Sequence, residues 1–127
     1  IAVQMIRGAE EKGLIRPGET MLVEATSGNT GVGLAMAAAS MGYKLIICMP
    51  RTPNMTERFM LCKAYGATVQ LSDPAHGAAG FIAMAEEIAA STTNAYLLRQ
   101  FSNPDNPSAH WEGTGKEIWE SMGGKVD

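Results

Sequence analysis

The sequence is poor in the residues that mark secreted, metal-binding or nucleic-acid-binding proteins. Among its 127 residues are two histidines and two cysteines, Cys48 and Cys62, which lack the CxxC spacing of a zinc site. Such a pair is typical of reduced thiols inside a cell, and we expect neither a disulfide nor a metal site. The net charge of −3 argues against nucleic acid as a partner.

Long hydrophobic runs are also lacking. No apolar stretch approaches the roughly 20 residues that a membrane-spanning helix needs, so we expect no membrane segment. The first residues, "IAVQMIRGAEEKG", begin inside an apolar helical pattern without an initiator Met, and "MGGKVD" stops where a turn would lead into another strand. We therefore expect residues 1–127 to be one partial domain of a longer chain, truncated at both ends.

What the sequence does contain is an alternation of helical and strand-like segments. Apolar residues make up 46% and charged residues 18% of the chain, the balance of a globular α/β protein. Alternation in units of about 25 to 30 residues predicts right-handed βαβ crossovers. The expected fold is a three-layer open parallel sheet of about four strands with helices on both faces. The strands are expected at 20–25, 44–50, 67–73 and 95–100, and the helices at 2–12, 31–42, 55–66, 81–89 and 106–122.

Local signals refine three of these helices. Thr56 is a candidate N-cap, and "PAHGAAG" (74–80) is expected to be a loop. Asn106 and Pro107 form a cap-plus-proline signature for the last helix. In that helix we expect Trp111, Ile118 and Met122 to form a buried stripe, and His110 to take part in the helix packing.

The stretch "EATSGNTGVG" (24–33) joins the first strand to the second helix and is richer in polar groups than a simple turn requires. In a parallel sheet, ligands collect where strand ends feed helix N-termini, whose free N–H groups attract anions. Thr26, Ser27 and Thr30 add hydroxyl donors, and the Asn29 amide can donate and accept. The loop therefore suits a carboxylate or a phosphate.

Two nucleotide-binding motifs do not fit this loop. The glycine order is G-x-x-G-x-G rather than the G-x-G-x-x-G of dinucleotide-binding proteins, and no Gly-Lys-Ser/Thr follows as in a P-loop. A simpler alternative is a capped turn in which Ser27 or Asn29 bonds only the end of the helix.

The loop and its flanks closely resemble the fold type II enzymes that use pyridoxal phosphate (PLP), and most of all the O-acetylserine (thiol) lyase, or cysteine synthase, family. The resemblance covers essentially the whole chain. It extends through "GLIRPGET", "TERFMLCKAYGA", "LSDPAHGAAG" and "RQFSNPDNPSAHWEGTGKEIW". The related cystathionine β-synthases share the first loop, but "SDPAHGAAG" and "QFSNPDNP" look more like cysteine synthase.

The resemblance implies roles for five residues. Thr26, Ser27, Asn29 and Thr30 would clamp the carboxylate of the amino-acid substrate, and Asn29 would also bond the ring hydroxyl of PLP. Gln100 would be a second carboxylate contact. The lysines at 44, 63 and 116 are interpreted as solvated surface residues.

The implied reaction is a β-replacement that converts O-acetyl-L-serine and sulfide into L-cysteine and acetate. In the family, the lysine that forms a Schiff base with PLP would lie just before Ile1, and the phosphate-binding loop beyond Asp127. We therefore expect no catalytic residue in this chain and no activity from it alone.

The chain departs from the family in "RTPNMTERF" (51–59) and at Arg99, where Gln is commoner. Three alternatives stay open: a β-cyanoalanine synthase, a cystathionine β-synthase-like enzyme, and a non-catalytic homologue that acts by binding. The resemblance also implies a homodimer and a possible complex with serine acetyltransferase. The expected location is the cytoplasm, or a plastid or mitochondrion if a transit peptide has been lost.

Overall fold

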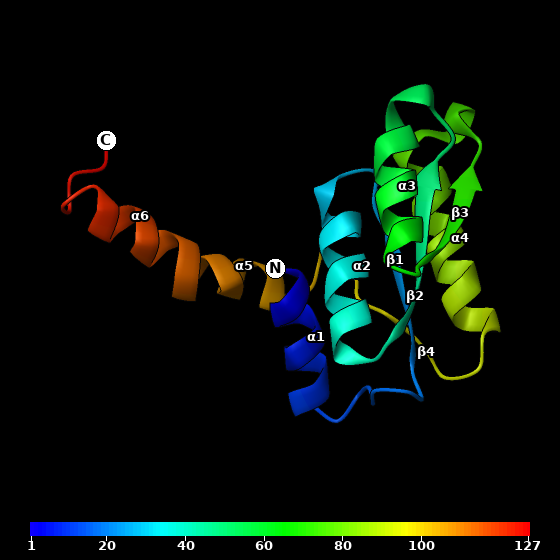
Figure 1. The fold of residues 1–127 in the computed structure, drawn as a ribbon, viewed down its shortest axis with the longest axis horizontal. Helices are drawn as coiled ribbons and strands as arrows, with labels where there is room; N and C mark the ends of the chain where they lie inside the picture. Colours follow the sequence, from blue (N-terminus) through cyan, green and yellow to red (C-terminus); the bar gives the residue numbers. More distant parts are fainter.

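The computed structural model describes all residues 1–127 and contains one four-stranded sheet in which every pairing is parallel (Figure 1). The strand order is β3-β2-β1-β4. The strands are β1 (Met21–Ala25), β2 (Lys44–Pro50), β3 (Thr68–Ser72) and β4 (Ala95–Leu97). The expected α/β fold with a parallel sheet is confirmed.

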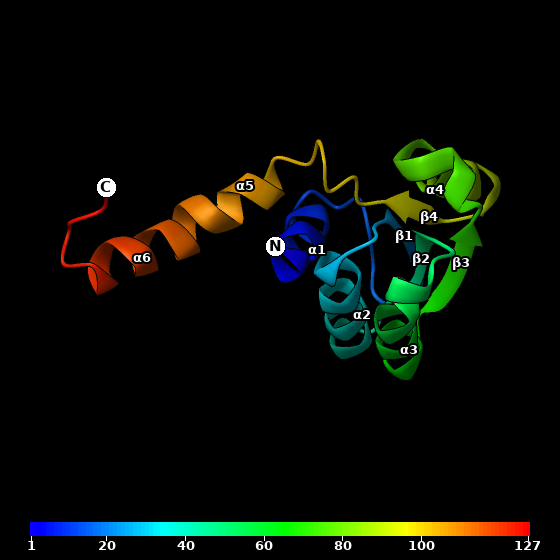
Figure 2. The ribbon, with the colours of Figure 1, turned by 90° about the horizontal axis from the view of Figure 1, so that it is seen from above.

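Helices cover both faces of the sheet, as Figure 2 shows from above. One face carries α1 (Ala2–Glu11), α2 (Asn29–Met41) and α3 (Thr56–Ala64), and the other carries α4 (Gly77–Ser91). The larger core lies under the first three helices, and a smaller one under α4 contains Val23, Cys48 and Phe81. None of the helices has the length and apolar character needed to cross a membrane.

The alanine-rich α2 lies close against the sheet because its inward side chains are small. Leu34, Ala35 and Ala38 are buried there. At Gly31 a Cβ atom would lie 2.8 Å from Cγ2 of Thr26, so no side chain fits at this position without movement. The first turn of α2 is thereby held against the end of β1.

Two expected helix starts are wrong. Thr56 does not cap α3 but is its first residue; a 3₁₀ turn (Pro53–Met55) precedes it, and the Thr56 hydroxyl donates to the Pro53 carbonyl oxygen at 2.8 Å. The segment 74–80 is not all loop, because a 3₁₀ turn (Pro74–His76) leads into α4 at Gly77. The Asp73 carboxylate accepts from the Ala75 N–H at 2.9 Å and so starts this turn.

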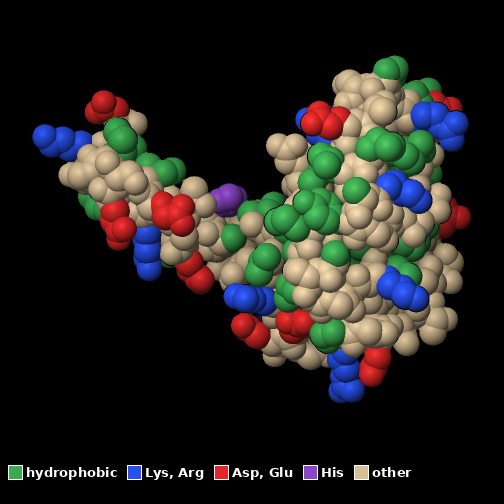
Figure 3. Space-filling model, viewed as in Figure 1, with side chains coloured by type: hydrophobic (Ala, Val, Ile, Leu, Met, Phe, Trp, Pro, Cys, Tyr) green, Lys and Arg blue, Asp and Glu red, His purple; other side chains and the backbone are tan.

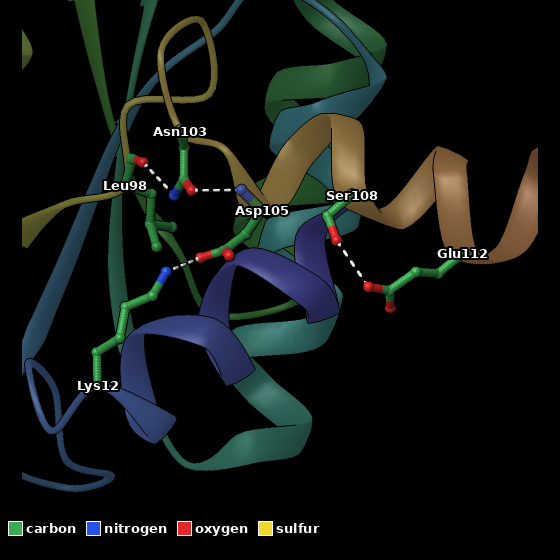
Figure 4. A network of polar contacts seen from close by, with 6 residues as sticks. All are labelled: Lys12, Leu98, Asn103, Asp105, Ser108 and Glu112. Carbon is green, nitrogen blue, oxygen red and sulfur yellow. Dashed lines mark hydrogen bonds and ion pairs between the residues drawn. The ribbon is translucent and has the colours of Figure 1, made fainter.

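The last helical segment begins earlier than expected. It consists of α5 (Asp105–Ala109), a π-helical turn (His110–Thr114) and α6 (Gly115–Ser121). The residue at the N-cap position is Pro104 rather than Asn106. Asn103, just before it, accepts from the Asp105 N–H through Oδ1 at 2.9 Å and donates through Nδ2 to the Leu98 carbonyl at 2.8 Å (Figure 4). Asn106 instead donates to the Gln100 carbonyl at 2.8 Å. The stretch "NPDNP" holds the same Asn-Pro signature twice, so sequence alone could not choose between them.

The expected buried stripe on this segment is also wrong. Residues 105–121 form an arm that projects from the domain (Figures 1 and 3), and Trp111 is 84% exposed, Ile118 49% and Met122 57%. His110 is exposed as well, so it does not take part in packing. The apolar spacing is present, but nothing within these 127 residues packs against it.

Candidate functional site

The polar residues singled out from the sequence lie around the carboxyl ends of β1 and β4, which are neighbours in the sheet. The chain leaves the carboxyl end of β1 toward α2 and the carboxyl end of β4 toward α5. The loops at the carboxyl ends of the strands are the usual ligand sites of open parallel sheets.

The loop between β1 and α2 is anchored by Thr26. This residue is 4% exposed, and its N–H donates to the Cys48 carbonyl at 2.9 Å. Its hydroxyl oxygen accepts from the Gly28 N–H at 3.2 Å. The loop backbone is therefore fixed at its base, where it leaves the sheet.

Ser27 and the first two residues of α2, Asn29 and Thr30, present unpartnered polar groups. Ser27 and Asn29 are exposed and Thr30 is half-buried, and none of their side chains makes a hydrogen bond within the chain. The helix starts after Gly28 with no side-chain cap. The alternative of a turn in which Ser27 or Asn29 caps the helix is therefore wrong. The Gly31 N–H donates to the Gly28 carbonyl at 3.2 Å, and the N–H groups of Asn29 and Thr30 remain available to an anion.

Gln100 lies beside this loop but outside β4, which ends at Leu97 rather than at residue 100. Arg99 adopts a left-handed backbone conformation (φ 57°) that turns the chain out of the strand. The Gln100 side chain donates through Nε2 to the Ala25 carbonyl at 2.8 Å. Gln100 is thereby held next to the residue that precedes Thr26. The second N–H of its side-chain Nε2 makes no hydrogen bond within the chain.

Sequence reasoning missed Glu24, the residue that connects these two segments. Its side chain is 1% exposed; Oε1 accepts from the Ala25 N–H at 2.9 Å and Oε2 accepts from the Gln100 N–H at 3.1 Å. A carboxylate in the otherwise apolar strand "MLVEA" was the available signal.

The burial of Glu24 changes its titration. Desolvation raises its pKa from 4.5 to about 7, although the hydrogen bonds from Ala25 and Gln100 and the Arg99 charge act in the opposite direction. The neighbouring Cys48 thiol, on β2, has its pKa raised to about 11 by burial and by the charge of Glu24. This thiol is therefore protonated near neutral pH and is not a nucleophile.

None of the five lysines of the chain lies at the loop. Lys12 follows α1 and Lys44 begins β2, both at the amino ends of the strands, and Lys63 belongs to the last turn of α3. Lys12 forms a 2.7 Å ion pair with Asp105 (Figure 4), while Lys116 and Lys125 belong to the arm and the tail after it. The donor set at the site consists of hydroxyls, amides and backbone N–H groups, which suits an anionic ligand and offers no amine for a covalent bond to a carbonyl.

Comparison with known proteins confirms the resemblance. The family model for the pyridoxal-phosphate dependent enzyme matches residues 1–127. The chain is 51% identical over 127 residues to cysteine synthase 3 of Caenorhabditis elegans and 52% identical over 128 residues to cysteine synthase A of Escherichia coli. It is 44% identical over 131 residues to the cystathionine beta-synthase of Apis mellifera. All of this chain is covered in each case, but only 37%, 39% and 25% of the three relatives.

Solved structures agree with the sequence relatives. A hydrogen sulfide-producing enzyme from Fusobacterium nucleatum matches with a TM-score of 0.93 and 44% identity, over 99% of this chain and 42% of that one. An O-acetylserine sulfhydrylase isoform from Entamoeba histolytica matches with a TM-score of 0.83 and 43% identity, over 99% of this chain and 37% of that one. The chain thus spans about two fifths of the length of its cysteine synthase relatives, and it belongs to the family of pyridoxal-phosphate dependent enzymes.

Proposed function

We propose that this chain is the substrate-binding part of a cysteine synthase, which replaces the acetate of O-acetyl-L-serine by sulfide to form L-cysteine. The observation that carries the proposal is the helix α2 that begins without a cap behind a loop of unpartnered polar groups. Relatives at about 50% identity with the printed name cysteine synthase support the choice of reaction. We call the longer protein that contains residues 1–127 the full-length enzyme.

In this proposal the loop holds the carboxylate of the substrate. The N–H groups at the start of α2 and the hydroxyls of Thr26, Ser27 and Thr30 would donate to its two oxygens, with Gln100 as a further donor. Hydrogen bonds to a charged acceptor are shorter and stronger than neutral ones. Holding the carboxylate at two or more points fixes the direction of the bonds at the α-carbon, which is the orientation a proton abstraction requires.

The chain fits PLP as a partial site. Asn29, which is exposed and has a free amide, would contact the ring hydroxyl of the cofactor. The cofactor supplies the electron sink for the reaction when bound. Ala2 packs against the second turn of α2, since its Cβ lies 3.7 Å from a Cβ built on Gly33. A lysine placed just before Ile1 would therefore lie on the same side of the domain as the loop, which supports the proposed position of the Schiff-base lysine.

Two other β-replacement reactions and one non-catalytic role are the alternatives to this proposal. The match to a cystathionine beta-synthase supports a related β-replacement with a larger thiol as acceptor. A β-cyanoalanine synthase would use the same carboxylate loop. A non-catalytic homologue would keep the loop and lack the lysine before Ile1.

We also propose the assembly implied by the resemblance: a homodimer in the cytoplasm, with serine acetyltransferase as a partner that offers a C-terminal carboxylate to the same loop. Such a carboxylate has the charge and size of the substrate group. Size-exclusion chromatography of the full-length enzyme, alone and with that partner, measures both associations.

The experiment for the function is a set of acceptor assays on the full-length enzyme. With O-acetyl-L-serine as donor, we expect release of acetate and formation of cysteine with sulfide, at a higher kcat/KM than with cyanide or homocysteine. A donor in which the carboxylate is replaced by an amide should be a poor substrate because the loop would lose its charged partner. A protein that binds PLP without releasing acetate with any acceptor would contradict the proposal.

A further inference from the structure

Glu24 is a buried carboxylate that the proposed reaction does not use. Only 1% of its surface is exposed to solvent, and both of its carboxylate oxygens accept hydrogen bonds from backbone N–H groups. One bond goes to its own strand, at Ala25, and the other to Gln100 at the end of the neighbouring segment. Burying an ionisable side chain is costly unless its polar atoms are hydrogen-bonded or paired.

Glu24 and Gln100 are part of a small hydrogen-bond network at the ends of β1 and β4. Glu24 accepts from Gln100, and Gln100 donates through Nε2 to the carbonyl of Ala25, the residue between Glu24 and Thr26. Two bonds, of 3.1 and 2.8 Å, thus connect the last residues of β1 to the turn after β4, and the third, of 2.9 Å, fixes the carboxylate on its own strand. The strand ladder cannot make this connection, because the β1–β4 pairing ends at Val23 opposite Leu97.

Without the Glu24 carboxylate, the site would lose the acceptor for two backbone N–H groups. The Gln100 N–H has no other partner in the structure, and a buried donor without an acceptor is unfavourable. The segment 98–100, which already contains the left-handed Arg99, would then be free to move relative to Thr26.

We propose that Glu24 is a positioning residue, which sets the distance between the 26–30 loop and Gln100 so that both reach one substrate carboxylate. The inference rests on the proposed function. Glu24 itself touches neither substrate nor cofactor; it acts through the backbone of Ala25 and of Gln100. Its charge is opposed nearby by Arg99, which pairs with Glu86 of α4 at 3.3 Å, and the other titratable neighbour is Cys48 of β2.

The test compares three variants of the full-length enzyme. Glu24→Gln keeps the size of the side chain but places an NH₂ group against one of the two N–H donors. Glu24→Asp keeps the charge but is one methylene shorter. Glu86→Gln is the matched control, because it makes the same change of charge beside Arg99 without touching Gln100. We expect both Glu24 variants to raise the KM for O-acetylserine by about tenfold, the equivalent of one lost hydrogen bond to a charged group.

The remaining kinetic constants separate positioning from a general loss of structure. The KM for sulfide and the PLP content should stay within twofold of wild type, and Glu86→Gln should behave as wild type. Hydrogen exchange at the Gln100 amide should become faster in both Glu24 variants, while α4 exchanges at the wild-type rate. Wild-type KM in folded Glu24 variants would overturn the positioning role.

One further measurement needs no variant. In the wild-type enzyme labelled with ¹⁵N-glutamine, the Gln100 amide signal should shift with pH through a midpoint near 7, as its acceptor gains or loses a proton. A Gln100 signal that does not titrate would overturn the link even if the variants fail to fold. A wild-type enzyme without any turnover of O-acetylserine would instead overturn the proposed function, and the positioning role with it.

Discussion

The carboxylate of Glu24 accepts a hydrogen bond from the backbone N–H of Gln100 at 3.1 Å, across 76 residues of sequence. Because β4 returns to the open side of β1, the last strand in sequence lies beside the first. The bond is made where the two strand ends meet. The proposed carboxylate contacts, on the 26–30 loop and at Gln100, are brought together by this arrangement.

The raised pKa of Glu24 predicts a pH-dependent stability. Since the folded pKa of about 7 lies above the ordinary 4.5, folding favours the protonated form. The contribution of Glu24 to the free energy of unfolding is fully present below pH 4.5 and is lost as the pH rises through 7. The loss amounts to about 3 kcal/mol, because each pKa unit corresponds to about 1.4 kcal/mol. Urea unfolding of the 127-residue chain between pH 5 and 8 should show this fall. In Glu24→Gln the slope over that interval should be smaller; an unchanged slope would contradict the assignment to Glu24.

Replacement of Gly31 and of Gly33 in α2 by alanine should have opposite effects on the free energy of unfolding. A Cβ at Gly31 would lie 2.8 Å from Cγ2 of Thr26, whereas at Gly33 the nearest atom is the Cβ of Ala2 at 3.7 Å, an ordinary contact. Gly31→Ala should therefore lower the free energy of unfolding by about 1–3 kcal/mol through overpacking. Gly33→Ala should raise it by about 0.5–1 kcal/mol, because alanine favours helix.

Denaturant unfolding of the two alanine variants measures both effects. Because the displaced atom belongs to Thr26, Gly31→Ala should also weaken substrate binding in the full-length enzyme. Equal stability of the two variants would show that the loop can move away from Gly31 without cost.

Much of the fold was predictable because each segment signals its own structure. The continuous apolar run at 44–50 and the alanine-rich helix after the glycine loop need only local sequence, and the alternation of the two implies the parallel sheet. The loop at 26–30 was predictable for the same reason, since its polar groups follow a strand and precede a helix.

Features set by an unusual backbone turn or by a distant partner were not predictable. The end of β4 at Leu97 depends on the left-handed turn at Arg99, and the burial of Glu24 depends on an N–H group that lies 76 residues away. The exposure of Trp111 has a related cause. Its spacing indicates an apolar face, but the sequence does not say whether a neighbour within the chain covers it.

The 127-residue chain alone should not retain PLP. Its lysines lie at the amino ends of the strands, on α3, or on the projecting arm and tail, and none reaches the loop. After incubation with PLP and gel filtration, we expect no cofactor absorbance to elute with the protein. Co-elution of one equivalent of PLP would contradict this prediction and would require a complete cofactor site within residues 1–127.

The last prediction separates a ligand-binding loop from a purely structural one, and it uses Thr26→Val in the full-length enzyme. Valine keeps the methyl group that packs against Gly31 but removes the hydroxyl, which accepts from the Gly28 N–H and is proposed to donate to the substrate. Loss of one hydrogen bond to a charged group corresponds to about 1.5–3 kcal/mol, so kcat/KM for O-acetylserine should fall roughly ten- to 150-fold.

The cofactor content should remain that of wild type, because Thr26 is not proposed to contact PLP. Thr68→Val provides the control, since Thr68 begins β3 at the opposite edge of the sheet and is exposed. If the loop only supported the fold, Thr26→Val would lower the melting temperature and leave kcat/KM near the wild-type value. Measuring the melting temperature, bound PLP and kcat/KM on the same preparation distinguishes these outcomes, because a carboxylate site loses substrate affinity even where the folded loop is preserved.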